Sequence, residues 1–83
     1  MHKIEWTEDA IKDLQKLDKF LAQRILKKVT WFSQHFDDVI PEPLSGDLLG
    51  TYKFRIGDWR VVYTIEKDII VVHALGHRRE IYR

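Results

Sequence analysis

Cationic side chains in the last third of the chain have the types and spacing needed to bind phosphate. Lys53 and Arg55 alternate with apolar residues, and Arg60 follows a Gly57-Asp58 pair that is typical of a two-residue hairpin loop. Such a loop places Arg55 opposite Arg60, and side-chain alternation puts all three cations on one face of the sheet. No acid of either strand shares that face, and like charges placed opposite each other destabilise a sheet.

Two interpretations of these three cations follow. One is an oxyanion pocket, in which guanidinium groups bind the oxygens of phosphate. The other is that the cations only keep an exposed sheet face soluble. Three cations that converge without an acid favour the pocket.

The C-terminal residues 76–83 add three Arg, one His and one Tyr. A three-residue turn at 66–68 would pair Ala74 with Arg60. Arg78 would then lie on the cationic face, provided that the strand continues past Gly76. The alternative is a frayed, solvated terminus.

These residues depend on the elements that position them, and the pattern predicts one α+β domain over residues 1–83. Thr7 and Asp18 are placed to cap two helices that form an αα-hairpin, each with one apolar stripe. A segment with Pro41 and Pro43 is expected to be a rigid, exposed connector. The expected helices are 8–17 and 18–36, and the expected strands are 3–6, 51–56, 59–65 and 69–75.

The other face of the hairpin is predicted to cover the helices. Its aromatic and aliphatic side chains fit the apolar stripes of the helices better than they fit a ligand site. The last strand is apolar on both faces apart from His73, so we expect it to be central, with His73 as a hydrogen-bonded core residue. The helix-facing residues are Tyr52, Phe54, Ile56, Trp59, Val61 and Tyr63.

Composition narrows the class of protein. The chain has 83 residues, no cysteine and a net charge of +1, so a disulfide framework and a Cys-based zinc site are excluded. Residues 1–50 hold seven Lys/Arg and nine Asp/Glu, whereas residues 51–83 hold seven and four, which places the basic excess in the last third. We find no metal-ligand spacing, cofactor motif, signal peptide or membrane-spanning run, and expect a cytoplasmic protein.

Two segments resemble a known family. Gly50–Tyr63 (GTYKFRIGDWRVVY) is similar to the conserved hairpin of the RelE/ParE superfamily, the toxins of type II toxin–antitoxin modules, and Gly76–Tyr82 (GHRREIY) is similar to its C-terminal motif. The resemblance covers essentially the whole chain. It implies a RelE-like β-α-α-β-β-β fold, with an antiparallel sheet packed against the αα-hairpin.

The RelE branch of this family implies an endoribonuclease that cuts mRNA, usually on the ribosome and without a metal. The RNA 2′-hydroxyl attacks the neighbouring phosphate. By position the family's cations correspond to Lys53, Arg55, Arg60 and Arg78, and its catalytic tyrosine to Tyr82. Arg55 replaces the lysine of the founding members, and the spacing from Arg78 to Tyr82 is shorter than in some of them.

The roles implied are binding of the scissile phosphate by Arg60 and Arg78, and binding of the flanking backbone by Lys53 and Arg55. Arg79 is a further substrate-binding candidate.

Either His77 or Tyr82 is the candidate for the base that such cleavage requires. An imidazole ordinarily titrates near pH 6.5, which suits neutral pH better than a phenol near 10, whereas the resemblance favours Tyr82. The residues leave this choice open.

The resemblance also implies a partner and leaves rival functions. The partner is an antitoxin, which we expect to be acidic and partly disordered. The rivals of an mRNA-cleaving toxin are a ParE-like toxin that poisons DNA gyrase by protein contact, and a catalytically silent binding module. The retained cations and Tyr82 favour the nuclease, because a gyrase poison has no need of a phosphate pocket.

Overall fold

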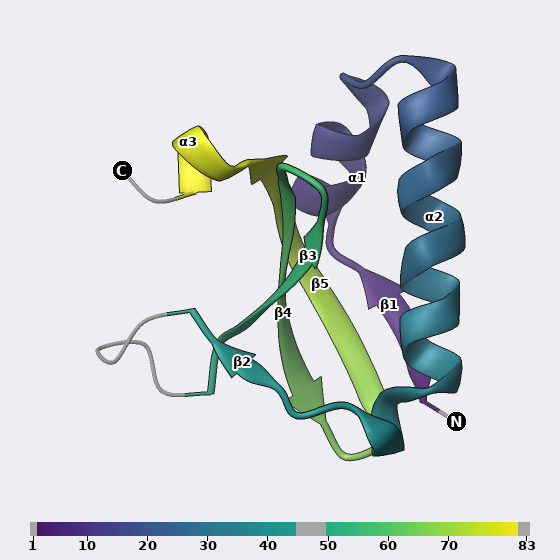
Figure 1. The fold of residues 1–83 in the computed structure, drawn as a ribbon, viewed down its shortest axis with the longest axis vertical. Helices are drawn as coiled ribbons and strands as arrows, with labels where there is room; N and C mark the ends of the chain where they lie inside the picture. Colours follow the sequence, from purple (N-terminus) through teal and green to yellow (C-terminus); the bar gives the residue numbers. More distant parts are fainter. Residues whose placement is uncertain (1, 45–49, 82–83) are drawn as a thin grey trace.

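The computed structural model describes residues 2–44 and 50–81, and for Glu80 and Ile81 the backbone alone. Figure 1 shows two helices on one face of a sheet, with a short third helix at the far end of the last strand. The elements are β1 (Lys3–Trp6), α1 (Glu8–Gln15), α2 (Lys19–Gln34), the 3₁₀ helix η1 (Phe36–Asp38), β2 (Glu42–Pro43), β3 (Tyr52–Ile56), β4 (Trp59–Glu66), β5 (Ile69–His77) and α3 (Arg78–Ile81).

The sheet confirms the predicted fold class and adds two features. Its strand order is β1-β5-β4-β3-β2, so β5 lies inside the sheet as expected. β1 pairs with β5 in parallel, and the other pairs are antiparallel, so the sheet is mixed. The second feature is β2, which lies within the segment predicted to be a connector and pairs with β3. No helix in the described part of the chain is long and apolar enough to cross a membrane.

Both predicted helix caps are present. Thr7 Oγ1 accepts a hydrogen bond from Ala10 N at 3.2 Å, and Asp18 Oδ1 accepts one from Leu21 N at 3.0 Å. Each cap satisfies one of the backbone N–H groups that a helix start leaves without a partner. α1 ends at Gln15, two residues earlier than predicted, and α2 ends at Gln34 before η1 begins.

The β3–β4 hairpin has the predicted register. Arg55 pairs with Arg60 and Phe54 pairs with Val61, because the Gly57-Asp58 loop fixes the pairing locally. The helix-facing side carries the core, in which the Phe32 ring of α2 stacks on Phe54 with centroids 4.1 Å apart. The buried hydrophobic residues of this core are Ala10, Ile25, Val29, Phe32, Phe36, Ile56, Val61, Tyr63, Ile70, Val72 and Leu75. Val62 is also buried, but it pairs with Lys53 and projects from the other face.

The predicted β4–β5 register is wrong by two residues, since Arg60 pairs with Gly76 and Ala74 pairs with Val62. One residue of the difference comes from the turn, where Glu66 pairs directly with Ile69 and only two residues remain in the loop. The other comes from a β-bulge beside Val62, which inserts one extra residue into β5.

The extra residue of the bulge is His73, because Val62 pairs with Ala74 while Tyr63 pairs with Val72. His73 was predicted to be a core histidine, but its side chain is exposed. Its Nε2 lies 2.7 Å from Thr64 Oγ1, so the expected hydrogen bond is present on the surface. A bulge of this kind depends on tertiary context and therefore has no simple sequence signal.

Candidate functional site

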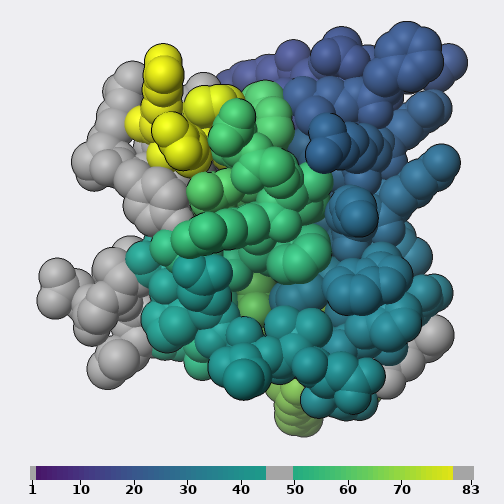
Figure 2. All heavy atoms as spheres, in the orientation of Figure 1, coloured from purple at the N-terminus to yellow at the C-terminus, as the bar shows by residue number. Residues whose placement is uncertain are grey.

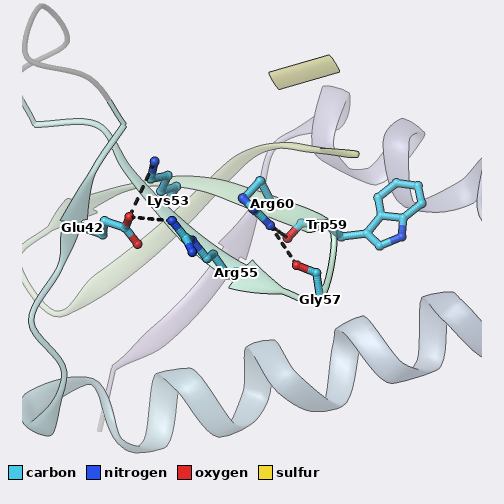
Figure 3. A network of polar contacts seen from close by, with 6 residues as sticks. All are labelled: Glu42, Lys53, Arg55, Gly57, Trp59 and Arg60. Carbon is cyan, nitrogen blue, oxygen red and sulfur yellow. Dashed lines mark hydrogen bonds and ion pairs between the residues drawn. The ribbon is translucent and has the colours of Figure 1, made fainter. Parts of the chain in front are cut away.

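The cations of the β3–β4 hairpin lie on the face of the sheet that the helices leave open. Figure 3 shows Lys53, Arg55 and Arg60 on the side of the sheet away from α2. Their positions follow from side-chain alternation, because Phe54, between Lys53 and Arg55, and Val61, next to Arg60, contribute to the core. The structure therefore brings together the three cations that the hairpin pattern predicted.

Glu42 is a member of this cluster that the sequence reasoning missed. It lies on β2 directly opposite Lys53. Its Oε1 is 3.6 Å from Lys53 Nζ and accepts a hydrogen bond from Arg55 Nη2 at 3.4 Å (Figure 3). The Lys53 side chain is 13% exposed, whereas Arg55 is 60% and Glu42 47% exposed. The open face thus carries a carboxylate between two cations.

Arg60 differs from the prediction that it projects freely from an exposed face. The residue is 7% exposed. Its Nη1 donates hydrogen bonds to the carbonyl oxygens of Gly57 at 2.9 Å and Trp59 at 3.1 Å, so the guanidinium is held against the hairpin loop (Figure 3). α3 contacts β4 and β5 at this end of the sheet. Arg60 consequently has a structural role in addition to any role in binding.

His77 lies on the other face from Arg60. It is the last residue of β5 and pairs with Trp59, and directly paired residues project from the same face. The two rings meet edge to face with centroids 5.7 Å apart. Trp59 packs against the core under the helices. The structure therefore does not bring the His77 ring together with the cations of β3.

The arginines that follow His77 begin a helix rather than a strand. Arg78 N donates to Asp58 O at 2.8 Å, which fixes the start of α3 beside the β3–β4 loop. Arg79 N donates to His77 Nδ1 at 3.3 Å. Arg78 and Arg79 are both exposed. The strand pairing that was expected to carry Arg78 onto the cationic face is therefore wrong, and α3 sets its position instead. Tyr82 lies outside the described residues.

A hollow of about 220 Å³ adjoins the cations at the β2–β3 edge of the sheet. Tyr63 is one of its lining residues, and burial raises the pKa of the Tyr63 phenol well above its ordinary value, while Tyr52 and Glu42 raise it further. Tyr63 therefore stays protonated at neutral pH. The hollow is lined by Phe32, Val39, Ile40, Glu42, Lys53, Phe54, Arg55 and Tyr63.

A metal site is not visible in the residues that the structure describes, since no three His, Asp or Glu side chains lie close enough to share an ion. The chemistry that the site offers comes from cations, one carboxylate and backbone groups. Cations and N–H groups aimed at one place can stabilise the charge of a phosphoryl transition state.

Comparison with known proteins places the chain in a family. A family described as "ParE toxin of type II toxin-antitoxin system, parDE" matches residues 4–82. The chain is 32% identical to the toxin RelG of Mycobacterium tuberculosis over 90 residues, covering 99% of this chain and 97% of that protein.

Two solved structures carry the same fold. The toxin–antitoxin complex RelBE2 of M. tuberculosis matches with a TM-score of 0.81 and 26% identity over 93% of this chain and 98% of that chain. The chromosomal ParDE system of P. aeruginosa matches with a TM-score of 0.74 and 14% identity over 93% and 96%. The fold is thus shared by proteins named for both branches. The chain belongs to the ParE toxin family of type II toxin–antitoxin systems, within the RelE/ParE superfamily.

Proposed function

We propose that this toxin is an endoribonuclease that cleaves mRNA by attack of the 2′-hydroxyl on the neighbouring phosphate, without a metal ion and on the ribosome. The observation that carries the proposal is the placement of Lys53, Arg55 and Arg60 on one open face, with Glu42 between the first two. RNA offers this face both a phosphate for the cations and a hydroxyl for the carboxylate.

The cations bind the substrate backbone in this proposal. Arg55 is the most exposed member of the cluster and presents a guanidinium that fits two phosphate oxygens. Arg78 and Arg79 add charge beside the β3–β4 loop. Arg60 keeps the loop in shape through its bonds to the Gly57 and Trp59 carbonyls, and its positive charge adds to the field at the site.

Glu42 is our choice for the base, ahead of the two candidates predicted from the sequence. It is a carboxylate among the cations, and a carboxylate oxygen can accept the proton of a 2′-hydroxyl. The His77 ring packs on Trp59 across the sheet, which separates it from a phosphate bound at Arg55. Tyr82 then serves as a binding residue or as the acid for the leaving 5′-oxygen.

An antitoxin is the proposed protein partner. The RelBE2 structure that this chain resembles is a toxin–antitoxin complex. An acidic, partly disordered antitoxin would complement the open cationic face and block access of RNA to it. Both proteins would act in the cytoplasm, where mRNA and ribosomes are found.

Inhibition of DNA gyrase is the second candidate function. Two observations favour it: the matching family is described as ParE, and Glu42 already forms ion pairs with Lys53 and Arg55. A gyrase poison would use the face for protein contact, so Glu42 would only neutralise the cations.

Primer extension on mRNA after brief induction, beside a gyrase supercoiling assay, separates the candidates. The nuclease predicts new 5′-ends and unchanged supercoiling, and Lys53→Gln/Arg55→Gln should remove the new ends. Lys12→Gln is the matched control, because Lys12 is an exposed cation on α1 that pairs only weakly with Glu8 at 3.8 Å. Gyrase inhibition without new 5′-ends would overturn the proposal, and neither effect would indicate a silent binding module.

A further inference from the structure

The outer face of α2 carries a concentration of positive charge that the proposed function does not use. Lys19–Gln34 contains four cations and no acidic residue. None of the ion pairs between described residues involves these four cations. Arg24, Lys27 and Lys28 lie within one helical turn, where like charges destabilise a helix. An anion supplied from outside would remove that cost.

Exposed aromatic rings lie in line with these cations. Phe20, Arg24, Lys27 and Trp31 follow one another at intervals of four, three and four, so they form one stripe, here called the α2 stripe. Phe20 is 82% and Trp31 48% exposed, while the core residues of α2 point the other way. With a rise of 1.5 Å per residue the α2 stripe is about 17 Å long.

A hollow lies at one end of the α2 stripe, and a stacked pair of rings at the other. The hollow measures about 340 Å³ and is lined by Phe20, Gln23, Arg24, Lys27 and Lys28. At the other end Trp31 stacks on His35, with centroids 4.5 Å apart and planes 20° apart, and a hydrogen bond between His35 Nδ1 and Trp31 O fixes the pair. Figure 2 shows the side chains of α2 projecting from one edge of the molecule.

We propose that the α2 stripe binds an unpaired segment of RNA, with Arg24, Lys27 and Lys28 on phosphates and the Phe20 ring stacked on a base. Proteins that bind single strands combine cations that follow the backbone with aromatic rings that stack on bases. An acidic protein segment would meet the same charges. It would also need a continuous apolar groove, whereas the two rings of the α2 stripe are separated by Arg24 and Lys27.

The α2 stripe lies on the other side of the sheet from Lys53 and Arg55, although Arg24 Nη2 reaches toward the hairpin loop and lies 3.8 Å from where a Cβ on Gly57 would be. α2 covers the face of the sheet opposite to the one that carries Lys53 and Arg55 (Figures 1 and 3). One strand bound at the hairpin therefore leaves α2 free for a second RNA segment. The protein would lie between two segments of RNA, as expected of a protein that works inside a folded RNA or ribonucleoprotein particle.

Binding of a fluorescein-labelled, unstructured 2′-O-methyl RNA, followed by anisotropy at several salt concentrations, tests the proposal. This RNA has no free 2′-hydroxyl, so it cannot be cleaved by the proposed reaction and reports binding alone. The variant Arg24→Gln/Lys27→Gln/Lys28→Gln should lower the slope of log K against log salt by about 2, since each phosphate contact contributes roughly 0.7 for single strands. Gln keeps a high helix propensity, and circular dichroism checks that α2 is intact.

Phe20 supplies a second, independent readout. Phe20→Ala should weaken binding by at least about fivefold, the low end of the range for one stacked base, and Phe20→Tyr should retain it. Lys12→Gln/Lys16→Gln, on α1 and at its C-cap, is the control for charge alone. The loss of RNA-binding free energy in Lys53→Gln/Arg55→Gln should add to the loss in the triple variant, because the two surfaces lie on opposite sides of the sheet.

Three results would overturn the proposal. The first two are an unchanged salt slope in the triple variant and unchanged RNA binding by Phe20→Ala. The third is a triple variant that loses binding to polyglutamate but keeps binding to RNA, which would identify a protein-docking surface. The proposed nuclease is judged separately by primer extension. If the protein cleaves mRNA and the triple variant keeps the parental salt slope, only the proposal for the α2 stripe is refuted. If the triple variant has a lower slope but the protein does not cleave mRNA, only the proposed nuclease is refuted.

Discussion

Replacing Glu42 by Gln should change catalysis and RNA binding in opposite directions. The substitution keeps the size of the side chain and removes one negative charge from the cationic face. Glu42 Oε1 lies 3.6 Å from Lys53 Nζ and 3.4 Å from Arg55 Nη2, so the carboxylate competes with phosphate for both cations. A carboxylate that is also the base for the 2′-hydroxyl would be lost at the same time.

The size of each effect can be worked out. Loss of a general base lowers the chemical step by roughly 10²–10⁴. A carboxylate about 5 Å from a bound phosphate repels it by about 0.8 kcal/mol in water, so its removal should tighten RNA binding roughly fourfold. Loss of the Glu42–Arg55 pair should change stability little, since these side chains are 47% and 60% exposed and such ion pairs contribute about 0–1 kcal/mol. Any larger loss would come from the Glu42–Lys53 pair, because the Lys53 side chain is only 13% exposed.

The assay is single-turnover cleavage of a short RNA or of ribosome-bound mRNA, beside binding of the 2′-O-methyl RNA. Glu5→Gln is the matched control, because it removes the same charge from β1 at the opposite edge of the sheet. Cleavage at the parental rate with tighter binding would refute the assignment of Glu42 as base and leave it as a neutralising residue. Slower cleavage with weaker binding would mean that Glu42 orients the cations instead.

Three further predictions concern stability. Arg60→Ala should lower the free energy of unfolding by about 1.5–3 kcal/mol in urea denaturation, because it removes charged hydrogen bonds to the Gly57 and Trp59 carbonyls; an unchanged midpoint would contradict this. Phe54→Ala should lower the free energy of unfolding by about 3 kcal/mol, which is the low end for a large core residue. The low end applies because Phe54 is only partly buried, although it stacks on Phe32. A loss below about 1 kcal/mol would argue against that packing. Since the pKa of Tyr63 is raised in the folded state, the unfolded chain loses the phenol proton first above about pH 10, and stability should fall there by at most about 1.4 kcal/mol per pH unit. Tyr63→Phe should abolish that contribution without loss of stability at neutral pH, because no described residue bonds the Tyr63 hydroxyl, whereas Tyr52→Phe should keep the fall.

The hairpin was predictable because a local signal determines it. A two-residue Gly57-Asp58 loop leaves one register for the flanking strands, and alternation then assigns both faces. The helices were predictable for a similar reason, since Thr7 and Asp18 cap them and their apolar stripes have helical spacing. Local patterns of this kind also placed Lys53 and Arg55 on the open face.

Glu42 and the position of Arg78 required information that is not local. β2 pairs with β3 only after the chain reverses direction, and Leu44 N donates a hydrogen bond to Thr51 O at 2.9 Å near this reversal. Pro41 and Pro43 favoured a connector over a strand in the sequence pattern. Arg78 depends on the β4–β5 register, which a shorter turn and the bulge at His73 shifted by two residues. The β2–β3 pairing and the bulge are set by tertiary packing rather than by a sequence pattern.

Counting charge along the sequence concealed how the fold distributes it. Residues 1–50 have a charge of −2, yet within them α2 alone has four cations and no acid. The compensating acids lie elsewhere, as with Glu8 and Asp9 in the first turn of α1 and Glu42 on β2. Conversely, the basic last third loses part of its charge on the open face to Glu42.

The electrostatic field that a ligand meets belongs to a surface and not to a segment. A chain with a net charge of +1 therefore presents one strongly basic helix and one partly neutralised open face. Raised salt should consequently weaken binding at α2 more steeply than binding at the hairpin.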